Sequence, residues 1–287
     1  MSSRPSALRG RRRVPVDRAF ERIRSDRTRG ASALAADGLR ELSRVANESA
    51  RRPAAQARAE FRSAARALKR AQPAMGPFLR WAAEWRALAR SPEPRAAARV
   101  WLRRERVRLR GERAGLARIA RSRFVSFRRV VTLSRSRSVL WALSAVSGSR
   151  RPEAVSVLES LPGGEGRSFA RELRHAGLRA RVIRDADGPR AVGTADLLLI
   201  GADAVFGDRS VVHKVGTRRL ARAARSAGVP VVVVAGRSKF VPGPPPRRAW
   251  PSRFDRTTAR YISEFWTDRG VRRGGAPRRR PARHTPL

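Results

Sequence analysis

The sequence has no cysteine, only three histidines and only three lysines in 287 residues. The missing cysteine excludes disulfides, thiolate metal sites and thiol nucleophiles together. The histidines (His175, His213 and His284) are scattered along the chain, so they predict no histidine-based metal site. We therefore expect no metal.

Long apolar runs are also missing. No stretch of about 18 apolar residues occurs, as a membrane-spanning helix would require. The N-terminus, "MSSRPSALRGRRRVPVDRAF", has no apolar segment of the kind found in a secretory signal. We expect no membrane association and a cytoplasmic location.

Negative charge is scarce, with 23 acidic side chains against 66 lysines and arginines and a net charge of +43. Arginine clusters release phosphate counterions, so one interpretation is binding to RNA or ribosomes through a basic surface. The other is compositional, since arginine replaces lysine almost throughout, as in proteins of GC-rich genomes. The best candidate for a polyanion surface is "RVWLRRERVRLRGERAGLARIARSRF", expected to form one very basic helix or two.

The first half of the sequence predicts helices. Residues 1–16 are basic and without periodicity, which indicates a disordered arm. Apolar residues recur at helical spacing over 17–123, and prolines divide this region into four or five short helices. Phe78, Trp81, Trp85 and Leu88 form an apolar stripe that we assign to the core of this helical domain.

The second half predicts a Rossmann-like domain over 124–271. Short runs rich in valine and isoleucine alternate with helical segments, which predicts right-handed crossovers and a parallel sheet. The fold class is therefore α/β, with a helical N-terminal domain followed by a Rossmann-like domain, and 272–287 is expected to be a disordered basic tail. The expected strands are 128–134, 154–160, 179–185, 195–201 and 229–236, and the expected helices 136–147, 165–177 and 215–227.

The loops after the first and fourth of these strands predict a site. No G-x-G-x-x-G or G-x-x-x-x-G-K-[ST] motif is present, so no cofactor is expected. Ligands of open parallel sheets bind where strand order reverses. If these two strands are neighbours there, "TLSRSRS" (132–138) and "GAD" (201–203) line one crevice. Ser134 and Ser136 would then lie near a helix N-terminus that suits an anion, with Asp203 facing the ligand.

Several motifs together resemble the alpha/beta/delta family of eukaryotic translation initiation factor 2B. They are "ADLLLIGADAVFGDRSVVHKVGTRRLARAARSAGVPVVVVAGRSKF", "VVTLSRSRSVLWAL", "SVLESLPGGEGRSFARELRHAGL" and "ARYISEFWTDRGV", with weaker matches in "DRTRGASALAADGLREL" and "RRPA". This family includes two sugar-phosphate isomerases, for methylthioribose 1-phosphate and ribose 1,5-bisphosphate. The resemblance implies dimerisation, as a homodimer or with related subunits, through the C-terminal domain.

The resemblance also implies roles for individual residues. The isomerases use a cysteine and an aspartate, which match Ser134 and Asp203 here. An alcohol is a far weaker acid than a thiol and needs a base to become a nucleophile. His213 stands where the family has asparagine, and Leu161 where it commonly has arginine. Matching by position leaves Arg29, Arg52 and Lys214 as phosphate contacts.

Three functions remain open from the sequence. The first is a non-catalytic initiation factor 2B-like protein that binds a phosphorylated sugar or nucleotide in the crevice and acts through protein partners. The second is a divergent aldose–ketose isomerase for a ribose phosphate, with Asp203 as acid or base and His213 replacing the missing acid. The third is a basic RNA- or ribosome-binding protein. Each residue also has a structural alternative: Asp203 or Ser134 as a cap, and Lys214 in a salt bridge.

Overall fold

A computed structural model describes residues 16–26, 29–124, 127–246 and 250–276. Most of the expected arm and most of the expected tail lie outside these residues. Val16 is described and begins the first helix, and the last strand runs to Arg273, two residues past the expected boundary at 271.

Helices form the N-terminal part, as the apolar spacing predicted. They are α1 (Val16–Ser25), α2 (Ala31–Ser49), α3 (Ala54–Ala71), α4 (Gly76–Leu88) and α5 (Pro94–Arg123). Prolines stand at the starts of three of them: Pro53 immediately before α3, Pro77 in the first turn of α4 and Pro94 as the first residue of α5. Proline fits a first turn because its missing N–H would have no partner there.

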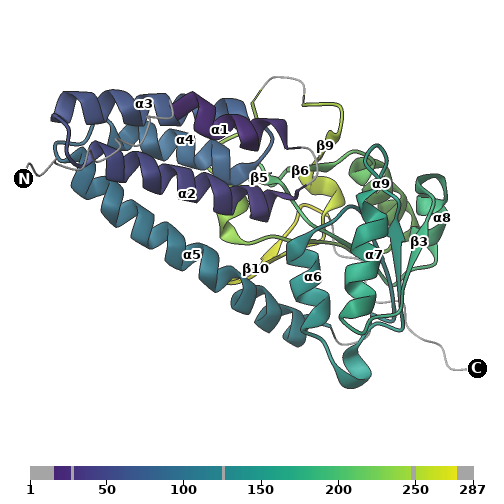
Figure 1. Cartoon of the computed structure of the whole chain (residues 1–287). Coiled ribbons are helices and arrows are strands. Elements are labelled where there is room, and N and C mark those ends of the chain that lie inside the picture. The colour runs from purple at the N-terminus through teal and green to yellow at the C-terminus, as the bar shows by residue number, and fades with distance from the viewer. Residues whose placement is uncertain (1–15, 27–28, 125–126, 247–249, 277–287) are drawn as a thin grey trace, which may run out of the picture.

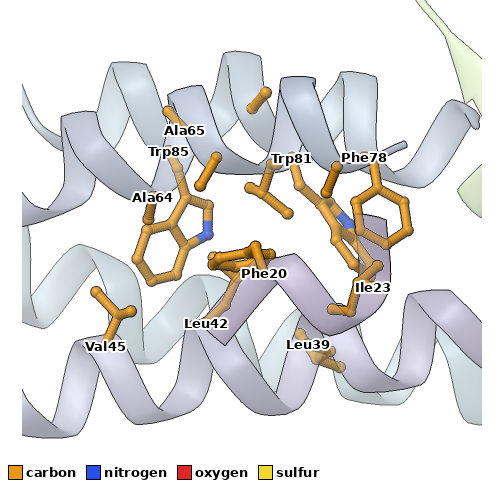
Figure 2. Packing of buried hydrophobic residues seen from close by; sticks show 14 of the residues in the cluster. Phe20, Ile23, Leu39, Leu42, Val45, Ala64, Ala65, Phe78, Trp81 and Trp85 are labelled. Carbon is orange, nitrogen blue, oxygen red and sulfur yellow. The ribbon is translucent and has the colours of Figure 1, made fainter. Parts of the chain in front are cut away.

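The aromatic stripe of α4 lies in the core of the bundle. Phe78, Trp81 and Trp85 are completely buried, and they pack with side chains of α1, α2 and α3 (Figure 2). Trp85 meets Phe61 edge-to-face, with ring centroids 4.9 Å apart. Tight aromatic packing of this kind adds to the stability gained from burial. The predicted role of these residues as core is confirmed.

The basic stretch after "SPEP" forms one helix, α5, of 30 residues. Its Ala98 and Leu102 belong to the core of the helical bundle, whereas its Leu116 and Ala120 belong to the core under the sheet. The helix thus runs from one layer of the protein to the other (Figure 1). The expectation that all helices here would be short is wrong for α5.

A seven-stranded sheet in the order β11-β10-β7-β4-β1-β2-β3 forms the centre of the C-terminal part. All neighbouring pairs are parallel except the pair of β10 and β11 at the edge. The expected strands and parallel sheet are confirmed, while β10 and β11 were not assigned from the sequence. The strands are β1 (Arg129–Thr132), β2 (Ala154–Leu158), β3 (Ala180–Ile183), β4 (Leu197–Ile200), β7 (Val231–Val234), β10 (Glu264–Thr267) and β11 (Gly270–Arg273).

Three of the helices that connect these strands, α6, α7 and α9, lie at the expected places, whereas the short α8 was not expected. Gly177 and Gly228 lie just beyond the ends of α7 and α9, with φ of +79° and +75°, a backbone region that glycine adopts at low cost. The connecting helices are α6 (Arg137–Ser144), α7 (Glu165–His175), α8 (Gly188–Gly193) and α9 (Thr217–Ala227), with 3₁₀ turns η1 (Gly148–Arg150), η2 (Asp185–Asp187), η3 (Arg237–Lys239) and η4 (Ala259–Tyr261).

A second, four-stranded sheet was not expected from the sequence. Its order is β8-β5-β6-β9, and it lies between the larger sheet and the helical bundle (Figure 1). Its strands are β5 (Ala204–Phe206), β6 (Val211–Lys214), β8 (Phe240–Val241) and β9 (Phe254–Thr257). Within the described residues, no helix has the length and apolar character needed to cross a membrane.

Candidate functional site

The first and fourth sequence-predicted strands, β1 and β4, are neighbours, with Val130 opposite Leu197. From this pair, the chain proceeds to β2 and β3 on one side and to β7 and β10 on the other. Strand order therefore reverses between β1 and β4, and the loops after both strands meet at the same edge. The predicted crevice is confirmed as the place where these loops come together.

A cavity of about 860 Å³ opens at this edge. The loops after β1 and β4 line it together with α6, α7, β6, η3 and the start of α2. Six of the seven sequence-predicted site residues are in its wall: Arg29, Ser134, Ser136, Asp203, His213 and Lys214.

Ser134 makes two hydrogen bonds within the protein. Its hydroxyl donates to Glu165 Oε1 across 2.8 Å, and its backbone N–H donates to the Ser160 hydroxyl across 2.7 Å. Its φ of +62° places it in the left-handed region. The helix cap expected of Ser134 is instead made by Ser136, which accepts a hydrogen bond from the Val139 N–H of α6.

Lys214 lies beside the same carboxylate. Its ammonium is 3.0 Å from Glu165 Oε1 and also donates to the carbonyl of Pro162. The Lys214 side chain is only 7% exposed, so the ion pair is largely protected from water. Lys214 therefore has the structural role considered from the sequence, and its position in the cavity wall also places it where an anion could bind.

Asp203 is the last residue of the loop between β4 and β5, and its backbone makes hydrogen bonds on both sides. Its N–H donates to the Val212 carbonyl across 2.9 Å, and its carbonyl accepts the Gly76 N–H of α4 across 2.7 Å. Its carboxylate caps no described helix; Asp255 instead accepts the N–H groups of Gly216 and Arg218 at the start of α9. Burial raises the pKa of Asp203 to about 6, although Lys239 opposes the shift.

His213 is buried, and its ring is oriented by one neighbour. The Thr217 hydroxyl donates to the carbonyl of Lys214 at 2.6 Å and lies 3.2 Å from His213 Nδ1. Because that hydroxyl has a single proton, it accepts from Nδ1–H, and Nε2 is left as an acceptor. Burial, with Lys239 and Lys214 nearby, lowers the pKa of His213 to about 3. The imidazole is thus neutral at physiological pH.

The two predicted arginine contacts differ. Arg29 lines the cavity, where Asp26 and Asp37 bind its guanidinium and raise its pKa. Arg52 is not part of the cavity wall. It belongs to the turn between α2 and α3, and its guanidinium forms an ion pair with Glu60. This turn lies at the end of the bundle remote from the sheets (Figure 1). The geometry therefore gives no support to Arg52 as a ligand contact.

Sequence reasoning missed eight of the eleven charged residues of the wall, among them Glu165 and Lys239. Glu165 lies in a motif that resembles the family, but its role depends on contacts with Ser134 and Lys214 that no local pattern reveals. Lys239 did carry a signal, because it is one of only three lysines in an arginine-rich chain and follows a buried strand. It lies at the end of η3, almost fully buried.

The cavity wall carries eight cationic side chains and three acidic ones. Among the described residues, Arg137 and Arg171 form no ion pair, and the N-terminus of α6 contributes backbone N–H groups. Such a surface attracts anions, and phosphate groups in particular. No group of three or more histidine or acidic side chains in the described part of the chain could hold a metal ion.

The basic face expected outside this site lies on α5. Both glutamates of this helix, Glu105 and Glu112, are buried, so its solvent side presents only arginine among charged groups. Other helices, such as α9, also expose several arginines. Binding of nucleic acid by these surfaces stays a prediction.

Known proteins resemble the chain in both sequence and fold. Residues 27–248 match the family described as the initiation factor 2 subunit family. A ribose 1,5-bisphosphate isomerase of Haloferax volcanii is 31% identical over 79% of this chain and 72% of its own length. A putative translation initiation factor eIF-2B subunit 2-like protein of Pyrococcus abyssi is 36% identical, over only 39% of this chain and 41% of its own.

Solved structures extend the comparison of folds. The translation initiation factor eIF-2B of Pyrococcus horikoshii has a TM-score of 0.73, at 24% identity, and the match covers 89% of this chain and 96% of that one. The 5-methylthioribose 1-phosphate isomerase of the same organism has a TM-score of 0.63, at 19% identity, over 90% and 84% of the two chains. At these identities the likeness concerns the fold alone.

Proposed function

This chain belongs to the initiation factor 2 subunit family, and we propose that it is a non-catalytic member that binds a phosphorylated sugar or nucleotide in the cavity and acts through protein partners. The observation that carries this proposal is the Ser134–Glu165–Lys214 arrangement. It combines a cationic wall with a hydroxyl, already hydrogen-bonded within the protein, at the position where the related isomerases have a thiol.

Binding of a phosphate is supported by the charges of the wall. The Lys214 ammonium, the arginines of α6 and α7 and the N-terminal N–H groups of α6 converge on one space. Charge-assisted hydrogen bonds of this type each contribute about 1.5–3 kcal/mol. Two or three of them would hold a sugar phosphate without any chemical step.

Absence of catalysis is supported by the state of Ser134. A serine becomes a nucleophile or an acid–base group only when a neighbouring base removes its proton. Its neighbour Glu165 is already paired with Lys214. His213, the other candidate, has a pKa near 3 and is a weak base, and its neutral ring cannot donate from Nε2.

Action through partners is supported by the solved relatives. One of them is a tetrameric eIF2B-beta2-delta2 complex from C. thermophilum, with a TM-score of 0.73 at 17% identity. For this chain we propose a homodimer, or an oligomer with related subunits, that forms through the C-terminal domain. Sedimentation equilibrium of the purified chain at 0.3 M salt, where non-specific charge effects are screened, tests it, and a monomer throughout would exclude the homodimer.

The test of the function uses ribose 1,5-bisphosphate with the purified protein. Carbon and phosphorus NMR should show line broadening or shifts of the sugar phosphate with no ketose product over many hours. Lys214→Met should abolish the broadening, while Lys69→Met, which removes an exposed lysine, should not. No interaction at millimolar concentrations with this sugar phosphate or with nucleoside monophosphates would contradict the proposal.

An isomerase is the second candidate, and one observation favours it. The Asp203 carboxyl faces the cavity with a pKa of about 6, close to the value that suits proton transfer at neutral pH. If it moves a proton between neighbouring sugar carbons, the same NMR experiment will show ketose signals. Those signals should vanish with Asp203→Asn and persist with Asp187→Asn, which changes an exposed carboxylate that is not part of the cavity wall.

The third function, RNA binding, predicts a different response. RNA affinity would fall steeply with salt, because arginine–phosphate contacts release counterions. It would survive Asp203→Asn and fall when the exposed arginines of α5 are replaced by glutamine. An equal number of replacements on α9 provides the control for net charge.

A further inference from the structure

A buried carboxylate of α5 holds the turn that carries Lys239. Glu112 accepts the N–H of Ser238 in η3 across 2.7 Å. Gly236, just before this turn, lies so close that a Cβ there would be 2.2 Å from Glu112 Cδ. A Cβ at position 236 would displace this carboxylate, so the position must be glycine while Glu112 occupies this place.

A second carboxylate secures the same turn from the other side. Asp268, directly after β10, accepts the N–H of Arg237 across 2.8 Å and also contacts the Arg237 guanidinium. The first two amides of η3 are therefore both bound by carboxylates of other elements. Because each amide has a fixed acceptor, the backbone that leads to Lys239 has little freedom to move.

Lys239 itself lies between two acids. Its nearly buried side chain reaches the cavity wall, where Asp203 interacts with its ammonium from the loop after β4 and Glu112 from α5. Burial lowers the pKa of Lys239, and the two carboxylates oppose that shift. Other charged groups around Asp203 are Glu165, Lys214 and Arg253.

The helical bundle contacts this corner at a second point. Gly76, at the start of α4, donates its N–H to the Asp203 carbonyl, and a Cβ at Gly76 would lie 2.2 Å from the Lys239 carbonyl oxygen. Asp203 and Lys239, which both line the cavity, thus touch the bundle through their backbones. The helical part of the chain is in direct contact with the site.

We infer that Glu112 is a positioning residue: by fixing the η3 turn it places Lys239 in the cavity wall near Asp203, so that the helical domain determines the arrangement of charge in the cavity. The inference is tested by two measurements, the titration of Lys239 and the binding of a ligand. Only the second of these rests on the proposed function. Glu112 is not part of the cavity wall, so it acts on a ligand only through Lys239.

The scarcity of lysine makes the test direct. Lysine labelled with ¹³C at Cε should give three side-chain signals, from Lys69, Lys214 and Lys239, and Lys239→Arg identifies the third by its loss. Glu112→Gln keeps an oxygen that can accept the Ser238 N–H but removes the charge. We expect the Lys239 titration midpoint to fall by roughly one pH unit, as for the loss of a nearby opposite charge.

Glu105→Gln is the matched control. Glu105 is the other buried glutamate of α5, but it binds Arg80 and Trp81 within the bundle. Its loss should lower the melting temperature and leave the Lys239 midpoint in place. If Glu112→Gln does not fold, Glu112→Asp, which withdraws the charge by one methylene, should shift the midpoint in the same direction by less.

The two readouts separate the two proposals. With ribose 1,5-bisphosphate, the pH at which affinity is half lost should move down together with the Lys239 midpoint. An unchanged midpoint in Glu112→Gln would overturn the inference whatever the ligand does. A shifted midpoint without binding by the wild-type protein would retain the inference and count against the proposed function.

Discussion

The Ser134 hydroxyl donates a hydrogen bond to the Glu165 carboxylate across 2.8 Å. The Ser134 hydroxyl is therefore part of the internal structure of the wall. Its neighbour is a carboxylate whose charge is already balanced by Lys214. This relationship is the basis of the proposal that the site binds an anion without catalysis.

Replacement of Ser134 should affect stability more than binding. Ser134→Ala removes the hydrogen bond to Glu165 and should cost about 1 kcal/mol, with a change in sugar-phosphate affinity below about threefold, smaller than the loss of one net hydrogen bond. Ser134→Gly removes the same bond but relaxes the φ of +62°. It should therefore be more stable than the alanine variant, by about 1 kcal/mol in urea unfolding. A glycine variant less stable than the alanine variant would contradict this account.

Replacement of Lys214 should affect both properties. Lys214→Met removes the partner of Glu165 and a cation of the wall, so sugar-phosphate affinity should fall at least about tenfold, the equivalent of one charge-assisted hydrogen bond. Calorimetric titration measures this loss. Lys69→Met, on the exposed side of α3, should change affinity by less than about twofold. Similar losses in both variants would mean that net charge, not position, governs binding.

The pH dependence of stability should contain two opposing contributions. The pKa of Asp203 is raised to about 6, so the folded state retains a proton from about pH 4 to 6 and stability falls as pH rises. The pKa of His213 is lowered to about 3, so the unfolded state takes up a proton below about pH 6.5 and stability rises with pH. Over the range in which both act, the slopes offset each other.

Single variants should separate these contributions. Relative to wild type, Asp203→Asn should gain stability as pH rises from 4 to 6, by up to about 1.4 kcal/mol per pH unit. His213→Asn should show the reverse trend. Urea unfolding at several pH values measures both, with Asp187→Asn as a control whose curve should run parallel to wild type above pH 4. Parallel curves for all three variants would rule out buried, shifted groups at 203 and 213.

The contact of Gly76 with Lys239 leads to a prediction about packing. Gly76→Ala would place a methyl carbon 2.2 Å from the Lys239 carbonyl oxygen, and it should destabilise the fold by about 1–3 kcal/mol and weaken ligand binding. Gly111→Ala is the matched control, since nothing lies within 4 Å of a Cβ at this position in α5. It should raise stability by about 0.5–1 kcal/mol through helix propensity. Thermal melts of both variants check the opposite signs.

The location of the site could be predicted from sequence because it depends on strand order. Alternating strands and helices imply a parallel sheet, and Ser134 and Asp203 follow the two strands between which the order reverses. The short strands of the second sheet were missed because they have only two to four residues each and, in β5 and β6, no alternation of buried and exposed positions. Periodicity carries no signal in such segments.

Residues whose partners are distant along the chain also could not be identified from the sequence. Glu112 lies in a run of arginines that predicted a solvated helix, yet its carboxylate binds an amide 126 positions later. Arg52, in contrast, was predicted as a site residue and lies outside the site. Its short motif resembled a family segment, but the turn between α2 and α3 lies far from the cavity and Arg52 pairs with Glu60. Motif matching alone does not supply the tertiary position.

The length of α5 has a mechanical consequence. A helix of 30 residues is a stiff rod of about 45 Å, and this one is embedded in the bundle core at its first turns and in the sheet core at its last. Glu112 and Gly115, which touch the η3 turn and Asp268, lie near the point where the rod enters the sheet. Because this rod is anchored in both cores, a tilt of the helical bundle would move the η3 turn, and with it the part of the cavity wall that carries Lys239.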